Sequence, residues 1–179
     1  MSDKKAQTRG RILAAARAAL LQRGPTESGL AELMGAAGLT VGGFYAHFTS
    51  KDALMLEVFQ QMLCQRRERV AQFDPVLPGH ERRVLLAAFY LSRKHRDASE
   101  QGCPLPSSIG ELARMPEGFR VVLAEHVELM TAQLAGRPEE AEQALADIAL
   151  MVGGLALARA LGPGELSDRV LRAAKSAIV

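Results

Sequence analysis

Cysteine is scarce in this chain of 179 residues, which contains only Cys64 and Cys103. Two cysteines do not build a disulfide framework in a chain of this length. The four histidines, at positions 47, 80, 95 and 126, show no metal-ligand spacing with one another or with either cysteine. The sequence therefore predicts no disulfide, no structural metal and no cofactor.

The patterns that would indicate an enzyme are also missing. Ser107 and Ser108 follow prolines without a nucleophile-elbow pattern, and no glycine-rich phosphate loop follows a strand. Carboxylates such as Glu125 and Glu128 are spaced like the solvated face of a helix. We therefore expect no enzymatic activity.

No apolar run approaches the roughly 18 residues of a membrane span. No signal peptide opens the chain, because the basic residues Lys4, Lys5, Arg9 and Arg11 lead into a helical pattern that Arg17 interrupts. Apolar residues make up 48% of the composition, which is enough to bury a core. We expect a cytoplasmic protein that does not enter a membrane.

Charge is unevenly distributed along the chain. Residues 1–51 carry seven Lys or Arg and three Asp or Glu, a net charge of +4, whereas the remainder has fifteen and seventeen, a net charge of −2. A basic first third is expected when one end of a protein meets DNA, and a solvated N-terminal charge cluster is the alternative.

The segment from Gly38 to Lys51 has the pattern of a short DNA-reading helix. Thr40 can cap a helix that starts at Val41, and two phenylalanines recur one turn apart on a face that we expect to be buried. Small residues on the opposite face would let the backbone approach a major groove, with polar donors at the flanks for phosphates. The buried residues are Phe44 and Phe48, the small ones Gly42, Gly43 and Ala46, and the flanking ones Tyr45 and His47.

A second amphipathic segment precedes it. Four apolar residues between positions 30 and 37 follow helical spacing, Ser28 stands ahead of them as a cap, and Gly38 ends the segment in the left-handed position. A longer helix is predicted before this, from about Ala6 to Arg23. Helix, tight glycine turn and helix form the helix-turn-helix signature.

The run from Gly24 to Leu54 resembles the N-terminal DNA-binding domain of the TetR/AcrR family of one-component bacterial transcription regulators. The family pattern is an alanine-glycine turn, a Ser/Thr cap, a glycine, then Tyr-x-His-Phe and Ser-Lys. The matching residues are Ala37, Gly38, Thr40, Gly42, Tyr45, His47, Phe48, Ser50 and Lys51.

The resemblance implies that Tyr45, His47 and Lys51 contact phosphates and that positions 41, 43 and 46 approach base edges. Position 43, often a small hydroxyl residue in the family, is glycine here, and Val41 and Ala46 carry no hydrogen-bonding group. Readout would then depend on thymine methyl groups and DNA shape. The predicted DNA-binding residues are Ser28, Thr40, Val41, Gly42, Gly43, Tyr45, Ala46, His47 and Lys51.

The remaining sequence reads as helices separated by proline and glycine. Helices are predicted at about 51–72, 80–96, 107–114, 117–135, 138–161 and 166–178. With the N-terminal segments this gives an all-α fold of about nine helices, which is also the architecture that the resemblance implies. We expect a helix-turn-helix DNA-binding domain at residues 1–51 and a helical ligand-binding and dimerisation domain at residues 52–179.

The last two long helices have the pattern of a dimer interface. A heptad-like stripe of Leu145, Ile148, Val152 and Leu155 accompanies two mid-helix glycines at positions 153 and 154. Each such glycine costs up to about 1 kcal/mol relative to alanine, which indicates close helix approach. The resemblance implies a homodimer in which these helices pair with their copies across a two-fold axis. The alternative is that the glycines face only the core of their own chain.

The implied function is a repressor that a small-molecule inducer releases from a palindromic operator in double-stranded DNA. The inducer pocket would be enclosed by the middle helices, for which the family has no shared motif. Flexible or aromatic residues lie in those helices but are more typical of core filler than of ligand contacts. They are Phe59, Met62, Phe89, Met130 and Met151.

Cys103 provides an alternative form of regulation. It lies in Gly102-Cys103-Pro104, before a short helix whose terminal N–H groups could make a thiol reactive, and some TetR-like electrophile sensors carry a cysteine in a similar context. The ordinary interpretation is a small buried hydrophobic residue. A third possibility is that the helical part is a dimerisation scaffold that binds no ligand.

Overall fold

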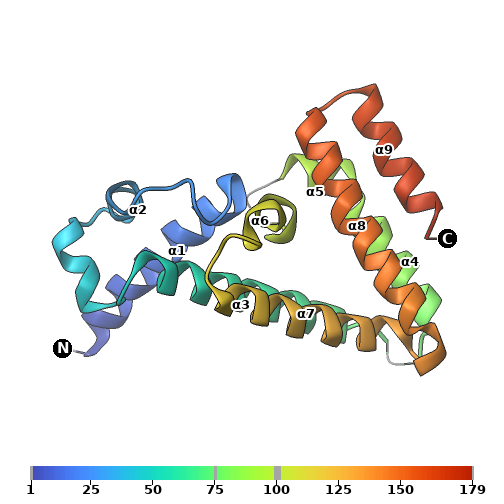
Figure 1. Cartoon of the computed structure of the whole chain (residues 1–179), viewed down its shortest axis with the longest axis horizontal. Coiled ribbons are helices and arrows are strands. Elements are labelled where there is room, and N and C mark those ends of the chain that lie inside the picture. Colours follow the sequence, from blue (N-terminus) through green and yellow to red (C-terminus); the bar gives the residue numbers. More distant parts are fainter. Residues whose placement is uncertain (1, 75, 99–101, 179) are drawn as a thin grey trace.

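The computed structural model of the chain describes residues 2–74, 76–98 and 102–178 (Figure 1). Within these residues every regular element is a helix, so the predicted all-α fold is confirmed. The elements are α1 (Ser2–Arg23), α2 (Leu30–Ala36), η1 (Val41–Ala46), α3 (Lys51–Ala71), α4 (Gly79–Tyr90), α5 (Arg93–Asp97), α6 (Leu105–Leu112), α7 (Glu117–Ala135), η3 (Pro138–Glu140), α8 (Ala141–Leu161) and α9 (Glu165–Ser176).

The helices place the N-terminal domain and the C-terminal helices at opposite ends of the molecule. Figure 1 shows α1 and α2 at one end, α4, α8 and α9 at the other, and α3 and α7 side by side between them. Helix α6 contacts both α1 and α8. The two ends are therefore connected through packed helices.

The core continues from one end to the other through α3. A stripe of α3 formed by Leu54, Val58, Met62 and Val70 is buried, and the ring centroids of Phe59 on α3 and Phe119 on α7 lie 5.8 Å apart. Burial of such large side chains contributes roughly 1.5–3 kcal/mol each. The contact between Phe59 and Phe119 thus packs α3 against α7.

Local chemistry explains several helix ends. The Ser50 hydroxyl accepts a hydrogen bond from the Ala53 amide at 3.0 Å, as expected of a cap for α3. Gly38 has φ of +66°, the left-handed conformation predicted for the turn after α2. Gly24 also has positive φ, and a Cβ there would lie 2.6 Å from the Ser107 carbonyl oxygen, so this glycine permits close approach of α1 and α6.

The prediction of one continuous helix at 80–96 is wrong, because this segment forms two helices, α4 and α5. Ser92 has extended backbone (φ −111°, ψ 152°), and its hydroxyl accepts a hydrogen bond from the His95 amide at 3.1 Å. A serine that satisfies an orphan helix donor favours a new start over continuation.

The role of Ser28 as a helix cap is also wrong. Gly29 is the N-cap of α2 and provides no side-chain bond. Ser28 is fully buried, and its hydroxyl oxygen has no hydrogen-bond partner among the described residues.

The expectation that no apolar run approaches the length of a membrane span is corrected at α8. Residues Pro138–Leu161 are long and apolar enough, by length and composition alone, to cross a membrane. The core helix of a soluble protein passes the same test, and α8 packs against α4, α7 and α9. However, only 39% of its most apolar window is buried within the chain.

The two glycines of α8 have different surroundings. A Cβ on Gly154 would lie 2.9 Å from the Ala174 Cβ and 3.2 Å from a Leu91 methyl, whereas one on Gly153 would meet no described atom within 4 Å. The alternative explanation, packing within the chain, is therefore correct for Gly154. Gly153 lies on the exposed face.

Candidate nucleic-acid interface and regulatory core

The segment predicted to read DNA, η1, is a 3₁₀ helix of six residues and not an α-helix. Hydrogen bonds of the i to i+3 type join the Gly43 amide to the Thr40 carbonyl at 3.1 Å and the His47 amide to the Phe44 carbonyl at 2.9 Å. Thr40 occupies the N-cap position with extended backbone, but its hydroxyl accepts no capping bond, so that part of the prediction is wrong. Two adjacent glycines, which disfavour an α-helix, account for the tighter and shorter form.

The two faces of η1 are separated as the sequence predicted. Phe44 is fully buried and stacks on Phe48 with ring centroids 5.7 Å apart. On the other face a Cβ added at Gly42 or Gly43 would meet no described atom within 4 Å. Tyr45 beside them is 68% exposed. A bare backbone surface with a projecting phenol is therefore available to a large partner.

The other flanking residues are less free than predicted. His47 is half-buried, and its enclosed Nδ1 has no hydrogen-bond partner among the described residues. The Lys51 side chain is also half-buried and donates a hydrogen bond from Nζ to the Thr26 carbonyl at 2.8 Å. Its charge stays near the proposed interface, but its position is set by the loop between α1 and α2. Ser28, also predicted to contact DNA, is fully buried, so its side chain cannot do so.

Two arginines of α1 contact residues on either side of η1. The sequence alone predicted no role for them beyond their positive charge. Arg11 donates a hydrogen bond to the Gly38 carbonyl at 3.2 Å, in the turn between α2 and η1. The Arg9 guanidinium lies 4.7 Å from the Phe48 ring centroid and pairs with Glu57 at 2.5 Å. These contacts could not be predicted from the sequence, because Arg9 and Arg11 are far in sequence from the residues that they contact.

Comparison with known proteins identifies this domain. Residues 12–58 match the family described as "Bacterial regulatory proteins, tetR family". The chain therefore carries the N-terminal DNA-binding domain of the TetR family. Regulators of this family are DNA-binding proteins without enzymatic activity, in agreement with the sequence prediction. Compared with curated protein sequences, the chain has no match.

Solved structures of TetR-like proteins share the fold over nearly the whole chain. The reduced form of E. coli NemR superimposes with a TM-score of 0.80 at 22% identity, covering 96% of this chain and 94% of that one. A TetR-family regulator from Agrobacterium tumefaciens gives 0.78 at 19% identity, with 96% and 97% covered. A TetR regulator from Chloroflexus aurantiacus J-10-FL gives 0.77 at 26% identity, with 98% and 94% covered.

Cys103 lies in the core of the helical part, separated from α6 by Pro104. It is 3% exposed, and its backbone N–H donates to His95 Nε2 at 3.3 Å. His95 Nδ1 in turn donates to the Tyr90 carbonyl at 2.8 Å. These two bonds require the neutral imidazole with its proton on Nδ1.

Two buried histidines in this core are held neutral by their surroundings. Burial lowers the pKa of His95 to about 4, with Arg66 and Arg159 acting in the same direction against the Tyr90 carbonyl. Burial also lowers the pKa of His126 to about 4, followed by the charges of Arg67 and Arg66. The core therefore already contains fixed positive charge and resists a further proton.

We expect stability to fall as pH decreases from about 6.5 to about 4. The unfolded chain, in which histidine has a pKa near 6.5, binds more protons in this window than the folded chain does. Replacing His126 with Gln should reduce the loss at pH 4.5 by about 2 kcal/mol, since each pKa unit corresponds to about 1.4 kcal/mol. Urea unfolding at pH 7 and pH 4.5 measures this. Equal pH dependence in both proteins would contradict the assigned environment.

Proposed function

We propose that this TetR-family regulator is a dimeric repressor that binds a palindromic operator through η1 and leaves it when a small molecule occupies its helical part. The bare face of η1 carries this proposal, because a surface without side chains suits close approach of the backbone to a groove. We assign residues 1–51 to the DNA-binding head and residues 52–179 to the regulatory and dimerisation part. A DNA target also agrees with a cytoplasmic location.

The proposed DNA contacts divide into two kinds. Tyr45, His47 and Lys51 lie at the flanks for phosphates, together with Thr40 at the start of η1. Val41 and Ala46, both exposed, are placed for the base edges, with Gly42 and Gly43 allowing the close approach. Phosphate contacts set affinity and salt dependence, whereas base contacts set sequence preference.

Replacing Tyr45 with Phe should weaken binding to all duplexes alike and leave the salt dependence nearly unchanged, because only a neutral phosphate-directed hydroxyl is removed. Replacing Val41 with Ser should instead change the preferred sequence. Both variants are compared by fluorescence anisotropy on duplexes selected from random sequence. If Tyr45→Phe changes sequence preference and Val41→Ser does not, the assignment of the two faces is wrong.

Helix α8 supports dimerisation through a different stripe from the one predicted. Val152 and Leu155 of the predicted stripe are buried within their own chain. The exposed face carries apolar residues at every fourth position, namely Leu145, Ala149, Gly153, Leu157 and Leu161. An apolar stripe of this length, with a glycine at its centre, suits close packing against a second copy of α8.

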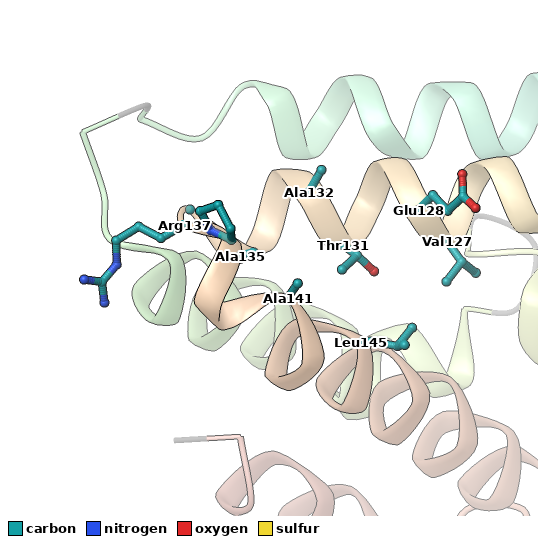
Figure 2. A pocket seen from close by; sticks show the side chains of 10 residues that line it. Val127, Glu128, Thr131, Ala132, Ala135, Arg137, Ala141 and Leu145 are labelled. Atoms are coloured by element: carbon teal, nitrogen blue, oxygen red, sulfur yellow. The ribbon is translucent and has the colours of Figure 1, made fainter.

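An open groove extends this surface. Figure 2 shows Val127 and Thr131 of α7 opposite Ala141 and Leu145 of α8, around a hollow of about 520 Å³. Leu145 belongs both to the groove and to the exposed stripe of α8. We assign the groove to the dimer surface and not to the effector, because it lies on the outside of the helical part.

Replacing Leu157 with Glu should convert the dimer to a monomer of 19.3 kDa, because a carboxylate would be buried without a partner at the centre of the interface. Leu85 on α4 is the matched control, since it is 50% exposed compared with 52% for Leu157. Leu85→Glu should remain dimeric. Sedimentation velocity distinguishes the two, and a dimeric Leu157→Glu variant would refute this interface.

Helix α6 provides a physical route from the core to the DNA-binding head. Cys103 precedes it, and near its other end Glu111 accepts hydrogen bonds from the amide of Thr26, at 3.2 Å, and from its hydroxyl. The Thr26 carbonyl accepts from Lys51, and Ser107 on α6 donates to the Leu20 carbonyl of α1 at 2.9 Å. An effector that binds better when α6 is displaced would shift the population away from the DNA-binding state.

A second candidate is a regulator that responds to oxidants or electrophiles through Cys103. The thiol stands before α6, and the similar NemR structure is that of a reduced form of its protein. Against it, the thiol is buried and a reagent must first gain access to it.

Modification by N-ethylmaleimide separates these two functions. If Cys103 is the sensor, the reagent should release operator DNA from the wild-type protein and from Cys64→Ser but not from Cys103→Ser. Fluorescence anisotropy with the selected duplex measures release, and mass spectrometry locates the modified thiol. Retention of DNA by fully modified wild-type protein would exclude the cysteine mechanism.

A further inference from the structure

Arg66 is a buried cation whose charge has no acidic partner among the described residues. It is 7% exposed, and its guanidinium carbon lies 4.9 Å from the Tyr90 ring centroid and 5.6 Å from that of Phe89. Nη2 is enclosed and has no hydrogen-bond partner within the described part of the chain. A buried charge without a partner is strongly destabilising, so this arrangement requires an explanation.

The other two buried arginines show how this fold usually compensates such a charge. Arg83 pairs with Glu140 and Asp147, each at 2.9 Å. Arg96 pairs with Asp97 at 2.7 Å and Asp168 at 2.8 Å. Each has two carboxylates, and Arg66 differs from both.

Arg159 brings a second incompletely bonded cation to the same region. Its Nη2 donates to the His95 carbonyl at 2.8 Å, but its enclosed Nε and Nη1 have no hydrogen-bond partner among the described residues. Burial, followed by Cys103, raises the pKa of Tyr90 well above its ordinary value, whereas Arg66 and Arg159 both act to lower it. Both guanidinium groups are therefore close enough to act on one phenol.

Two small spaces adjoin these groups. One of about 20 Å³ is lined by Arg66, Tyr90, Cys103 and His126 together with apolar side chains. Another of about 10 Å³ is lined by Arg66, Cys103 and two further arginines, Arg17 and Arg69. Neither lining includes a carboxylate. Each volume is that of about one water molecule, so a larger occupant must displace side chains of the lining.

We propose that this core binds a small planar oxyanion with Arg66 as its anchor, and that the nearby charge of Arg159 favours the anion without lining the space. This inference rests on the proposed function and names the chemical class of its effector. A guanidinium matches the paired oxygens of a carboxylate or nitrate in a bidentate geometry. The Tyr90 hydroxyl, enclosed beside Cys103, is a further donor at the space.

Binding would reach the DNA-binding head through Cys103 and α6. Cys103 lines both spaces and is separated from α6 by one residue. An anion bound at Arg66 would change the packing around Cys103 at the start of α6, whose other end holds Thr26 through Glu111. We therefore expect the anion to weaken operator binding.

The test uses acetate and nitrate as probes at constant ionic strength, balanced with sodium chloride. Isothermal titration calorimetry on the full chain should show saturable binding of at least one of the two. Arg66→Gln should weaken it at least tenfold, while Arg172→Gln, an exposed arginine on α9, should leave it unchanged. Arg159→Gln is the second variant, also expected to weaken binding, in case Arg66→Gln does not fold.

The outcomes separate this inference from the proposed function. Absence of saturable binding to wild-type protein, or equal binding by Arg66→Gln, would overturn the anion site even if operator binding is intact. Conversely, if the protein binds no duplex but still binds the anion through Arg66, the repressor function fails and the site remains. If the anion binds saturably and also lowers the operator affinity of the wild-type protein but not of Arg66→Gln, both the anion site and the repressor function are supported.

Discussion

Burial of Phe44 and Phe48 is the contact on which the DNA-binding head depends. A single 3₁₀ segment of six residues has too few hydrogen bonds to be stable alone. The two rings stack in the core of the head, and Arg9 covers one of them from α1. Because Phe44 and Phe48 fix the segment from one face, the opposite face of η1 needs no large side chains for stability. The open face follows from this one-sided anchoring.

The helical part is organised around charge as much as around apolar packing. Arg83 and Arg96 each bind two carboxylates and so connect α4 to α8 and α5 to α9. These pairs fix the relative positions of helices but leave no free charge. Arg66 lies over the Tyr90 ring, and Arg159 donates a hydrogen bond to the His95 carbonyl, but neither pairs with a carboxylate among the described residues. The region around Cys103 therefore stays electropositive. The same helices thus contain two buried arginines that are neutralised by carboxylates and one, Arg66, that has no carboxylate partner among the described residues.

Much of the head could be predicted because its chemistry is local. Gly38 in a left-handed turn, Ser50 as a cap and the alternation of large and small residues in η1 each depend on neighbours within one or two turns. The contacts of Lys51, Arg9 and Arg11 could not be predicted, since their partners lie 25 to 48 residues away. Ser28 fits the pattern of a cap, but tertiary packing buries it and leaves that position to Gly29.

By itself the sequence determined the all-α class, the positions of most helices and the family of the head, because helical periodicity, capping residues and glycine turns act over a few residues. Only the tertiary structure decided which faces are covered. It turned Val152 and Leu155 inward, left Gly153 exposed and placed Gly154 against Ala174. It also left Arg66 without a carboxylate among the residues that the structure describes. Burial and charge pairing depend on which distant segments meet, and periodicity along one helix does not contain that information.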